Sequence, residues 1–345
     1  VGSEMCIRDS PFSLTWERHS GGQDTLEALA LADMKLFFEL LNAPPEGRAW
    51  PLLRNFRHES RRTADCASFL AFSGELAAAG SPEGLLDRLT AFYQTRGVGL
   101  LGMGQVFRAR RTGDGAELVS VEDRPPVRLA DLVGYRQQKD LLIRNTEAFL
   151  RGKGSNNVLL YGDAGTGKST SIQALVNEYA DQGLRLIELY KEQYDLIPDI
   201  LRQVKGRNYR FLLFLDDLSF EENETSYKYL KAVMEGGAEA PPENVRICAT
   251  SNRRHLIKET LSDRTGDDIH EADTRQELMS LSARFGLTVT FQRPEKARFE
   301  TILEELAKQH NIQMPTEQLL LKAEAFALRA GGRSPRVAKQ FIEQC

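Results

Sequence analysis

A short glycine-rich segment constrains the fold of this 345-residue chain more than any other feature. Residues 162–169 read GDAGTGKS, which matches the pattern G-x-x-x-x-G-K-S/T. The apolar run Val158 to Tyr161 precedes the segment, and an amphipathic stretch from Ser169 to Gln182 follows it. Glycines let backbone N–H groups turn onto phosphate oxygens, and a helix N-terminus adds its dipole. The segment therefore predicts a phosphate-binding loop between a strand and a helix.

The positions of this loop have different expected roles. Lys168 should reach the β- and γ-phosphates of ATP, and the Ser169 hydroxyl should bind Mg²⁺. The other expected nucleotide contacts are Gly162, Asp163, Ala164, Gly165, Thr166, Gly167 and Thr170. A glycine-rich turn without a ligand is the alternative, and the agreement of strand, loop and helix argues against it.

A second element carries two carboxylates. The apolar run Phe211 to Leu215 ends in Asp216 and Asp217, as expected of a buried strand with Mg²⁺ chemistry at its C-terminal end. We assign Asp216 to the Mg²⁺ shell, through water, and Asp217 to the role of general base toward the attacking water. The alternative is an acidic turn after a core strand.

Another strand is expected over Val245 to Thr250, and Asn252 follows it. Its amide is predicted to lie beside the carboxylates, where it would hold the attacking water and sense the γ-phosphate. Capping of the next helix is the alternative role for this asparagine. Residues 252–255, NRRH, differ from the guanine-reading pattern N-K-x-D, which favours ATP over GTP.

The whole chain alternates between strand and helix patterns after residue 157, which predicts a parallel sheet with helices on both faces. The first ten residues resemble a translated sequencing adapter, and we give them no structural weight. The predicted organisation is a mainly helical N-terminal unit with a strand-like end over 11–120, a nucleotide-binding α/β domain over 121–293, and a helical segment over 294–345.

Composition restricts the function classes. Apolar residues make up 41% of the chain and charged residues 27%, as in soluble globular proteins. The net charge of −4 gives no global attraction to nucleic acid or anionic lipid. The apolar runs are far shorter than the ~20 residues that span a bilayer, so no membrane anchor is expected. Four scattered cysteines and no signal peptide favour the reducing cytoplasm.

The order of the predicted strands and helices, together with these motifs, resembles that of the AAA+ superfamily of ATPases. That resemblance implies that Arg284, just before the strand Leu287 to Phe291, is a finger acting in trans on a neighbouring subunit's γ-phosphate. It also implies that the helices after Pro294 form a lid, with Arg336 as its phosphate sensor and Arg333 as the competing choice. A surface arginine at each position is the alternative. The resemblance further implies a homo-oligomer, and a ring is its expected form.

A closer resemblance is to a bacterial AAA+ family catalogued as domain of unknown function 815, over roughly residues 95–345. It rests on LVGY at 132–135, QK at 138–139, NT at 145–146, NNVLLYG at 156–162, LDDLSF at 215–220 and DDIH at 267–270. The family resemblance implies a predicted ATPase with an undefined client, and Gly134 and Tyr135 as the adenine-side wall. Ala283 departs from the acidic residue expected before Arg284.

Three functions are compatible with these motifs. The first is an ATPase that hydrolyses ATP with Mg²⁺ to remodel an unknown protein or nucleic-acid client. Aspartate at position 217, where many AAA+ proteins have glutamate, makes slow hydrolysis an option. The second function is an ATP-gated scaffold or switch with negligible hydrolysis. The third, a small-molecule kinase, lacks a recognisable acceptor-binding motif.

Overall fold

The computed structural model describes residues 24–42, 66–96, 101–102, 104–113, 115–121, 124–220, 227–235, 240–252 and 281–345. The chain divides into two compact units, one of residues 1–104 and 120–123, the other of residues 105–119 and 124–345. The adapter-like residues 1–10 lie outside the described residues, as do residues 253–255 of the NRRH sequence and residues 267–270, DDIH.

The described part of the first unit is helical. Its helices are α3 (Asp24–Asn42), α5 (Cys66–Ala77) and α6 (Pro82–Arg96). Helix α6 packs against both α3 and α5. The rings of Phe72 and Phe92 stack with their centroids 3.9 Å apart, which joins α5 to α6.

The second unit contains a seven-stranded sheet in its described residues, in the order β2-β1-β4-β5-β6-β3-β7. The strands are β1 (Val106–Thr112), β2 (Gly115–Ser120), β3 (Val158–Gly162), β4 (Leu184–Leu189), β5 (Arg210–Leu215), β6 (Val245–Ser251) and β7 (Leu287–Phe291). All neighbours from β1 through β7 in this order pair in parallel. Consequently the C-terminal ends of β3, β5 and β6 meet at one edge.

Strands β1 and β2 extend this sheet beyond β4. The sequence pattern assigned a strand-like end to the N-terminal unit over 11–120, whereas β1 starts at Val106 and pairs with β4, Val106 opposite Leu186. The α/β sheet therefore begins before residue 120. The sequence pattern could not show this, because it indicates that a segment is a strand but not which sheet edge that strand joins.

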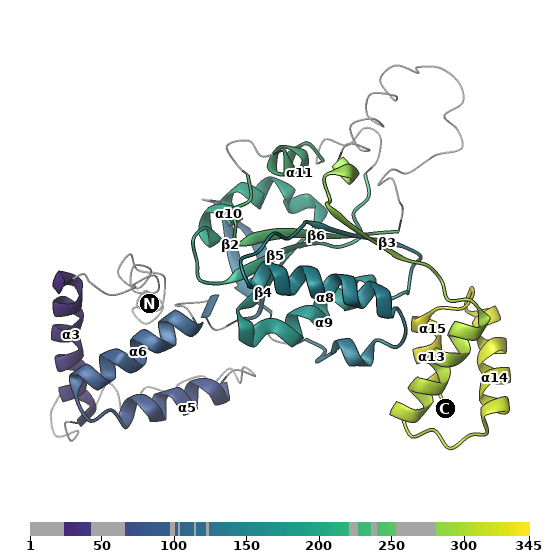
Figure 1. Cartoon of the computed structure of the whole chain (residues 1–345), viewed down its shortest axis with the longest axis horizontal. Helices are drawn as coiled ribbons and strands as arrows, with labels where there is room; N and C mark the ends of the chain where they lie inside the picture. The colour runs from purple at the N-terminus through teal and green to yellow at the C-terminus, as the bar shows by residue number, and fades with distance from the viewer. Residues whose placement is uncertain are drawn as a thin grey trace, which may run out of the picture. The chain divides into compact units, whose positions relative to one another are not determined.

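Helices cover both faces of the sheet (Figure 1), with α8 (Arg136–Leu150) and α9 (Lys168–Tyr179) on one and α10 (Ile197–Val204) and α11 (Tyr227–Met234) on the other. Short 3₁₀ turns are η1 (Leu129–Asp131), η2 (Ala180–Gln182) and η3 (Lys191–Leu196). Residues 211–215 of β5 are all buried, which explains why this strand reads as a continuous apolar run rather than an alternating one. The predicted parallel α/β architecture is confirmed.

The C-terminal helices α13 (Lys296–Gln309), α14 (Thr316–Arg329) and α15 (Pro335–Ile342) form a small bundle, here called the lid. Its core includes Phe299, Ile302, Leu303, Ala323 and Phe341. Helix α15 begins at a proline, and the Ser334 hydroxyl accepts the N–H of Val337 as its cap. Within the described ranges, no helix is both long and apolar enough to cross a membrane.

Candidate functional site: a phosphate loop beneath a helical lid

The loop of residues 162–169 leaves β3 and enters α9 as predicted. Gly162, Gly165 and Gly167 have φ values of 138°, 76° and 94°, which disfavour residues with a Cβ. A Cβ on Gly162 would overlap the carbonyl oxygen of Phe291 on β7. The Asp163 N–H donates to that same oxygen at 3.0 Å. The backbone approach between loop and β7 is thus possible only with glycine at position 162.

Lys168 lies folded into the loop. Its Nζ donates to the carbonyl oxygens of Gly162 and Asp163, both at 2.8 Å, and to Asn252 Oδ1 at 2.9 Å. Burial lowers the pKa of Lys168 below its ordinary value, and the carboxylates of Asp163, Asp217 and Asp216 oppose that shift. The ammonium is therefore directed toward the loop interior and the strand ends.

The two carboxylates after β5 lie close to the loop after β3, although β6 lies between these two strands in the sheet. Ser169 Oγ donates to Asp216 Oδ1 at 2.6 Å, and Thr250 Oγ1 donates to the same oxygen at 2.5 Å. The predicted Mg²⁺ ligand pair, Ser169 and Asp216, is brought into direct contact. A hydroxyl and a carboxylate are oxygen ligands of the type that Mg²⁺ prefers.

Asn252 bridges the lysine and the second carboxylate. Its Oδ1 accepts from Lys168 Nζ, and its Nδ2 donates to Asp217 Oδ1 at 2.8 Å. Asp217 has a φ of 52°, in the left-handed region. The predicted neighbours Lys168, Asp217 and Asn252 therefore form one hydrogen-bonded array.

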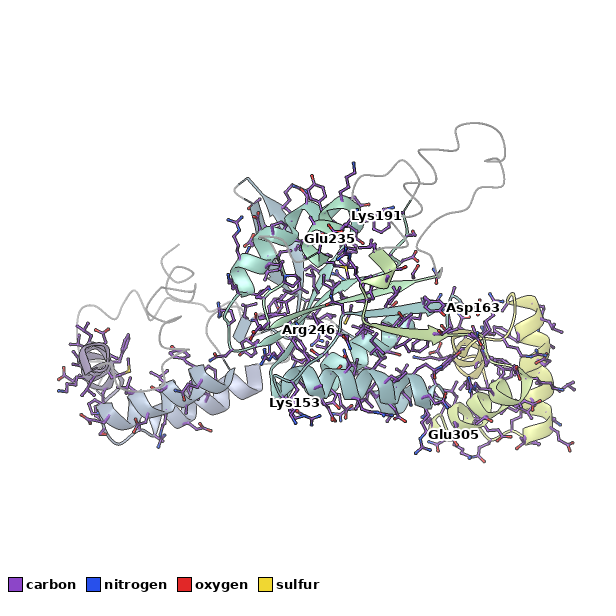
Figure 2. The ribbon with its side chains drawn as sticks, turned by 45° about the horizontal axis from the view of Figure 1, so that its top comes forward. Lys153, Asp163, Lys191, Glu235, Arg246 and Glu305 are labelled. Atoms are coloured by element: carbon purple, nitrogen blue, oxygen red, sulfur yellow. The ribbon has the colours of Figure 1, made fainter. Side chains whose placement is uncertain are left out.

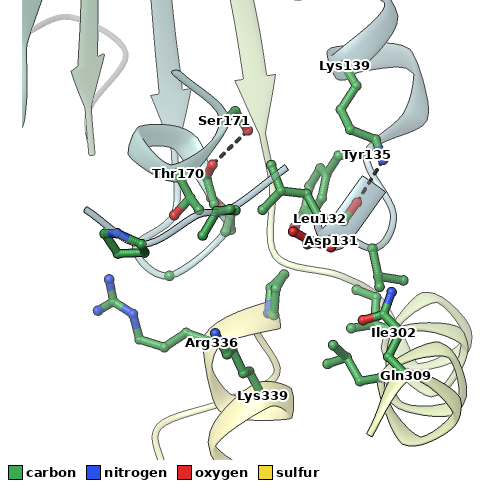
Figure 3. A pocket seen from close by; sticks show the side chains of 18 of the residues that line it. Asp131, Leu132, Tyr135, Lys139, Thr170, Ser171, Ile302, Gln309, Arg336 and Lys339 are labelled. Atoms are coloured by element: carbon green, nitrogen blue, oxygen red, sulfur yellow. Dashed lines mark hydrogen bonds between the residues drawn. The ribbon is translucent and has the colours of Figure 1, made fainter. Parts of the chain in front are cut away.

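A cavity of about 730 Å³ lies between the phosphate loop, the segment 125–139 and the lid (Figure 3). Its lining includes Gly165, Thr166, Gly167 and Thr170 of the predicted set, together with Tyr135 and Arg336. Its volume falls in the range of small-molecule sites, about 300–1,000 Å³. Its lining combines apolar residues such as Leu132, Val133 and Ile302 with polar ones such as Thr170 and Arg336, which suits a ligand that has both an apolar and a charged part.

Of the predicted adenine-side pair, Tyr135 lines the cavity, and Gly134 directly precedes it in the chain. They have φ values of 82° and 50°, so the chain turns sharply before α8. The Tyr135 hydroxyl donates to the carbonyl of Gln292 at 2.7 Å, and its ring packs 5.2 Å from that of Phe291. Burial raises the pKa of Tyr135 to about 12, so the phenol stays a protonated donor at neutral pH.

The lid contacts the loop directly. The Arg336 N–H donates to the carbonyl of Gly165 at 3.2 Å, and Figure 3 shows Arg336 and Thr170 facing the same space. Arg333 instead pairs with Glu324 within the lid, with Nε to Oε2 at 3.0 Å. The segment that leads from β7 into the lid also contacts the loop, because the Arg293 N–H donates to Asp163 Oδ2 at 2.9 Å; Asp163 is labelled in Figure 2.

Arg284 does not line this cavity in the described part of the chain. Its Nη2 lies 2.9 Å from Glu235 Oε1, at the end of α11 (Figure 2). Both side chains are about one-third exposed. The predicted finger is therefore held in an ion pair of its own chain.

Comparison with known proteins identifies the family. Residues 104–345 match the model of a family described as "Protein of unknown function (DUF815)". The chain belongs to this family. The strand order β4-β5-β6-β3-β7, with the glycine-rich loop after β3, gives the DUF815 chain a P-loop NTPase fold.

Curated relatives of the DUF815 chain include the replication factor C large subunits of Staphylothermus marinus, 36% identical over 90 residues, and Methanococcus vannielii, 31% identical over 104 residues. These matches cover 26% and 28% of the chain and 21% of either relative, so the chain spans about a fifth of their length.

Similar solved structures include Thermotoga maritima RuvB, described as a Holliday junction branch migration motor, at 18% identity and a TM-score of 0.44 over 64% of each chain. Another is the FIGL-1 AAA domain in complex with ADP, at 16% identity and a TM-score of 0.44, over 64% of this chain and 72% of that one.

Sequence reasoning missed several contributors to the DUF815 site. Thr250 joins the Asp216 carboxylate to the backbone N–H of Asp217, and only its place near the strand end, two residues before Asn252, pointed to it. Lys139 donates to the carbonyls of Leu129 and Leu132 at 3.2 and 2.8 Å, which fixes the wall before Tyr135. Lid residues also line the cavity, among them Ile302, Leu306, Gln309 and His310. Their helical spacing gave only a core signal.

Proposed function

We propose that this chain is an ATPase that binds ATP with Mg²⁺ in the cavity under the lid and hydrolyses it to ADP and phosphate. The observation that carries the proposal is the hydrogen-bonded array from Ser169 through Asp216, Thr250, Asp217 and Asn252 to Lys168. It gathers, at one edge of the sheet, the cation, carboxylate and amide groups that phosphoryl transfer uses.

The cavity geometry supports the orientation of the nucleotide. The positive-φ glycines at 165 and 167 shape a cradle for the phosphates, and the first N–H groups of α9 have no partner within the helix. Tyr135 and Ile302 line the other end, where the adenine base would lie against apolar surface. The residues present therefore fit ATP.

Each polar side chain has a proposed step. Lys168 would exchange one of its three acceptors for phosphate oxygens, and Ser169 with Asp216 would hold Mg²⁺. When bound, Mg²⁺ would neutralise charge on the phosphates. Asp217, oriented by Asn252, would accept the proton of the water that attacks the γ-phosphorus as the bond to the ADP oxygen breaks.

Arginines from the lid and from a second copy would complete the proposed site. Arg336 supports the lid-sensor role because it lines the cavity, whereas Arg333 is paired with Glu324. Arg284 would act in trans in a homo-oligomer, after leaving Glu235. Closing and opening of the lid would then couple the phosphate state to remodelling of a protein or nucleic-acid client. The proposed setting is the cytoplasm.

One observation favours the alternative of an ATP-gated scaffold with negligible hydrolysis. Asp217 is one methylene shorter than glutamate, and its Oδ1 already accepts from Asn252. A carboxylate held this way lies further from an attacking water. Tight ATP binding without turnover, unchanged in Asp217→Ala, would support the scaffold.

The test is Mg²⁺-dependent phosphate release by wild type, Lys168→Ala and Lys153→Ala. Lys153 is the matched control because it is exposed on the loop before β3, at the end of the strand away from the site (Figure 2). We expect turnover to fall about 100-fold or more in Lys168→Ala, because this variant lacks the positive charge that would stabilise the charge developing on the phosphate. Turnover should stay near wild type in Lys153→Ala. Phosphate appearing on an acceptor instead of in water would overturn hydrolysis in favour of a kinase.

A further inference from the structure

We infer that Thr250 is a positioning residue of the site, whose hydroxyl holds Asp216 and Asp217 in the arrangement that Mg²⁺ binding and hydrolysis require. The inference rests on the proposed function. It assigns to β6 a role separate from the sensor role of Asn252.

The contacts of Thr250 reach three consecutive residues of the neighbouring chain segment. Its Oγ1 donates to Asp216 Oδ1 at 2.5 Å and accepts the N–H of Asp217 at 2.9 Å. Its carbonyl oxygen accepts the N–H of Leu218 at 2.6 Å. Thr250 is only 2% exposed. A single residue of β6 therefore makes three hydrogen bonds to the turn that follows β5.

The direction of these bonds follows from the chemistry of a hydroxyl. Threonine has one O–H proton, which goes to the Asp216 carboxylate, while an oxygen lone pair takes the Asp217 N–H. A valine has the same shape but can make neither bond. The hydroxyl therefore fixes the separation of one carboxylate from the backbone that carries the other.

The turn at Asp217 explains why these hydrogen bonds are needed. With a φ of 52°, this residue is in the left-handed region, which a residue with a Cβ enters at a cost. The bonds from its own N–H and from that of Leu218 hold the turn there. Without the hydroxyl, the Asp217 N–H loses this acceptor, and the turn is free to relax.

The same hydroxyl also secures Asp216 independently of the loop. Ser169 and Thr250 donate to the same oxygen, Oδ1. Because Thr250 comes from a neighbouring strand, Asp216 keeps a buried donor whichever partner the Ser169 hydroxyl takes. Outer partners of this kind commonly change metal affinity or activity by about 10–100-fold.

The test compares full-length Thr250→Val and Thr250→Ala, which lack the hydroxyl, with Thr250→Ser, which keeps it. Thr146→Val is the matched control, because it removes a buried hydroxyl from α8 away from the site. The first readout is the Kd of a non-hydrolysable ATP analogue with Mg²⁺ and with EDTA. The second is kcat and KM for ATP. Thermal unfolding shows whether each variant is folded.

We expect the gain in affinity from Mg²⁺ to shrink about tenfold in the valine and alanine variants, with the EDTA Kd changed less than about twofold. We expect kcat to fall at least about tenfold and the KM for ATP to rise in step with the Kd measured with Mg²⁺, and Thr250→Ser and Thr146→Val to behave like wild type. A folded Thr250→Val variant with the same Mg²⁺ effect and the same kcat as wild type would overturn the inference. In that case, turnover by the wild-type protein would still support the proposed function. Conversely, a wild type without turnover whose Mg²⁺ effect is lost in Thr250→Val would leave the positioning role standing and remove the hydrolysis.

Discussion

Two arginines on either side of the N-cap of α15 differ sharply in environment, although they are only three residues apart. Arg333 points back into the lid and pairs with Glu324, which lowers the pKa of that carboxyl. Arg336 lines the cavity beside Gly165. A guanidinium already paired inside the lid has less to offer a phosphate than one that faces the loop. The sequence left both arginines open as sensors, and their partners favour Arg336.

Alanine substitution separates the two arginines. We expect Arg336→Ala to weaken ATP binding or slow turnover by about tenfold or more, because one charge–phosphate interaction is removed. Arg333→Ala should leave both within about twofold and lower the thermal midpoint only slightly, as an exposed ion pair contributes little. Isothermal titration and a phosphate-release assay measure these effects. The opposite ranking would transfer the sensor role to Arg333.

Among the elements, the junction of β3 and β7 couples the phosphate loop to the strand that leads into the lid. The two strands pair in parallel from Val158 opposite Leu287 to Gly162 opposite Phe291. Because the Phe291 carbonyl occupies the space where a Cβ would lie on Gly162, the loop starts from a fixed point on β7. Arg293, two residues beyond β7, then contacts Asp163 and the Gly331 carbonyl.

Substitution at Gly162 tests this junction. We expect Gly162→Ala to lose at least about 2 kcal/mol of unfolding free energy, since it combines an unfavourable φ with a steric overlap, and to lose ATP binding. Gly154→Ala is the control, because no heavy atom lies within 4 Å of its added Cβ. Denaturant unfolding followed by circular dichroism, with nucleotide titration, gives both quantities. Equal stability of the two variants would contradict the proposed close approach.

At the scale of the whole molecule, the trans role proposed for Arg284 requires a second copy of the chain. The cavity and the array lie within one chain, and Arg284 is paired with Glu235 away from the cavity lining. A finger acting in trans must exchange this ion pair, a weak one at such exposure, for a neighbour's phosphate. Assembly and activity should then rise together.

The assembly prediction is tested by turnover per chain against protein concentration. We expect it to rise as copies associate and to fall about 1,000-fold or more in Arg284→Ala, the range known for arginine fingers. Arg329→Ala, at an exposed position on α14, is the control. Turnover that is independent of concentration and insensitive to Arg284 would exclude the ring.

Much of the fold and site followed from local patterns. The glycines of the phosphate loop, the apolar runs of β3 and β5 and the carboxylates after β5 predicted their elements and the edge where they meet, because the C-terminal ends of parallel strands share one edge. The family resemblance was confirmed by the match over residues 104–345. The roles of the individual side chains stay predictions.

The sequence by itself determined the phosphate loop, since its glycine spacing is a local backbone requirement that is visible without any partner. Only the tertiary structure decided that β1 joins β4 and that β6 brings the Thr250 hydroxyl between Asp216 and Asp217. Strand order and side-chain partners depend on how distant segments pack, and an isolated buried threonine in an apolar strand looks like ordinary core. The two aspartates could be identified from the sequence, whereas the role of Thr250 became visible only in the structure, where β5 and β6 pair.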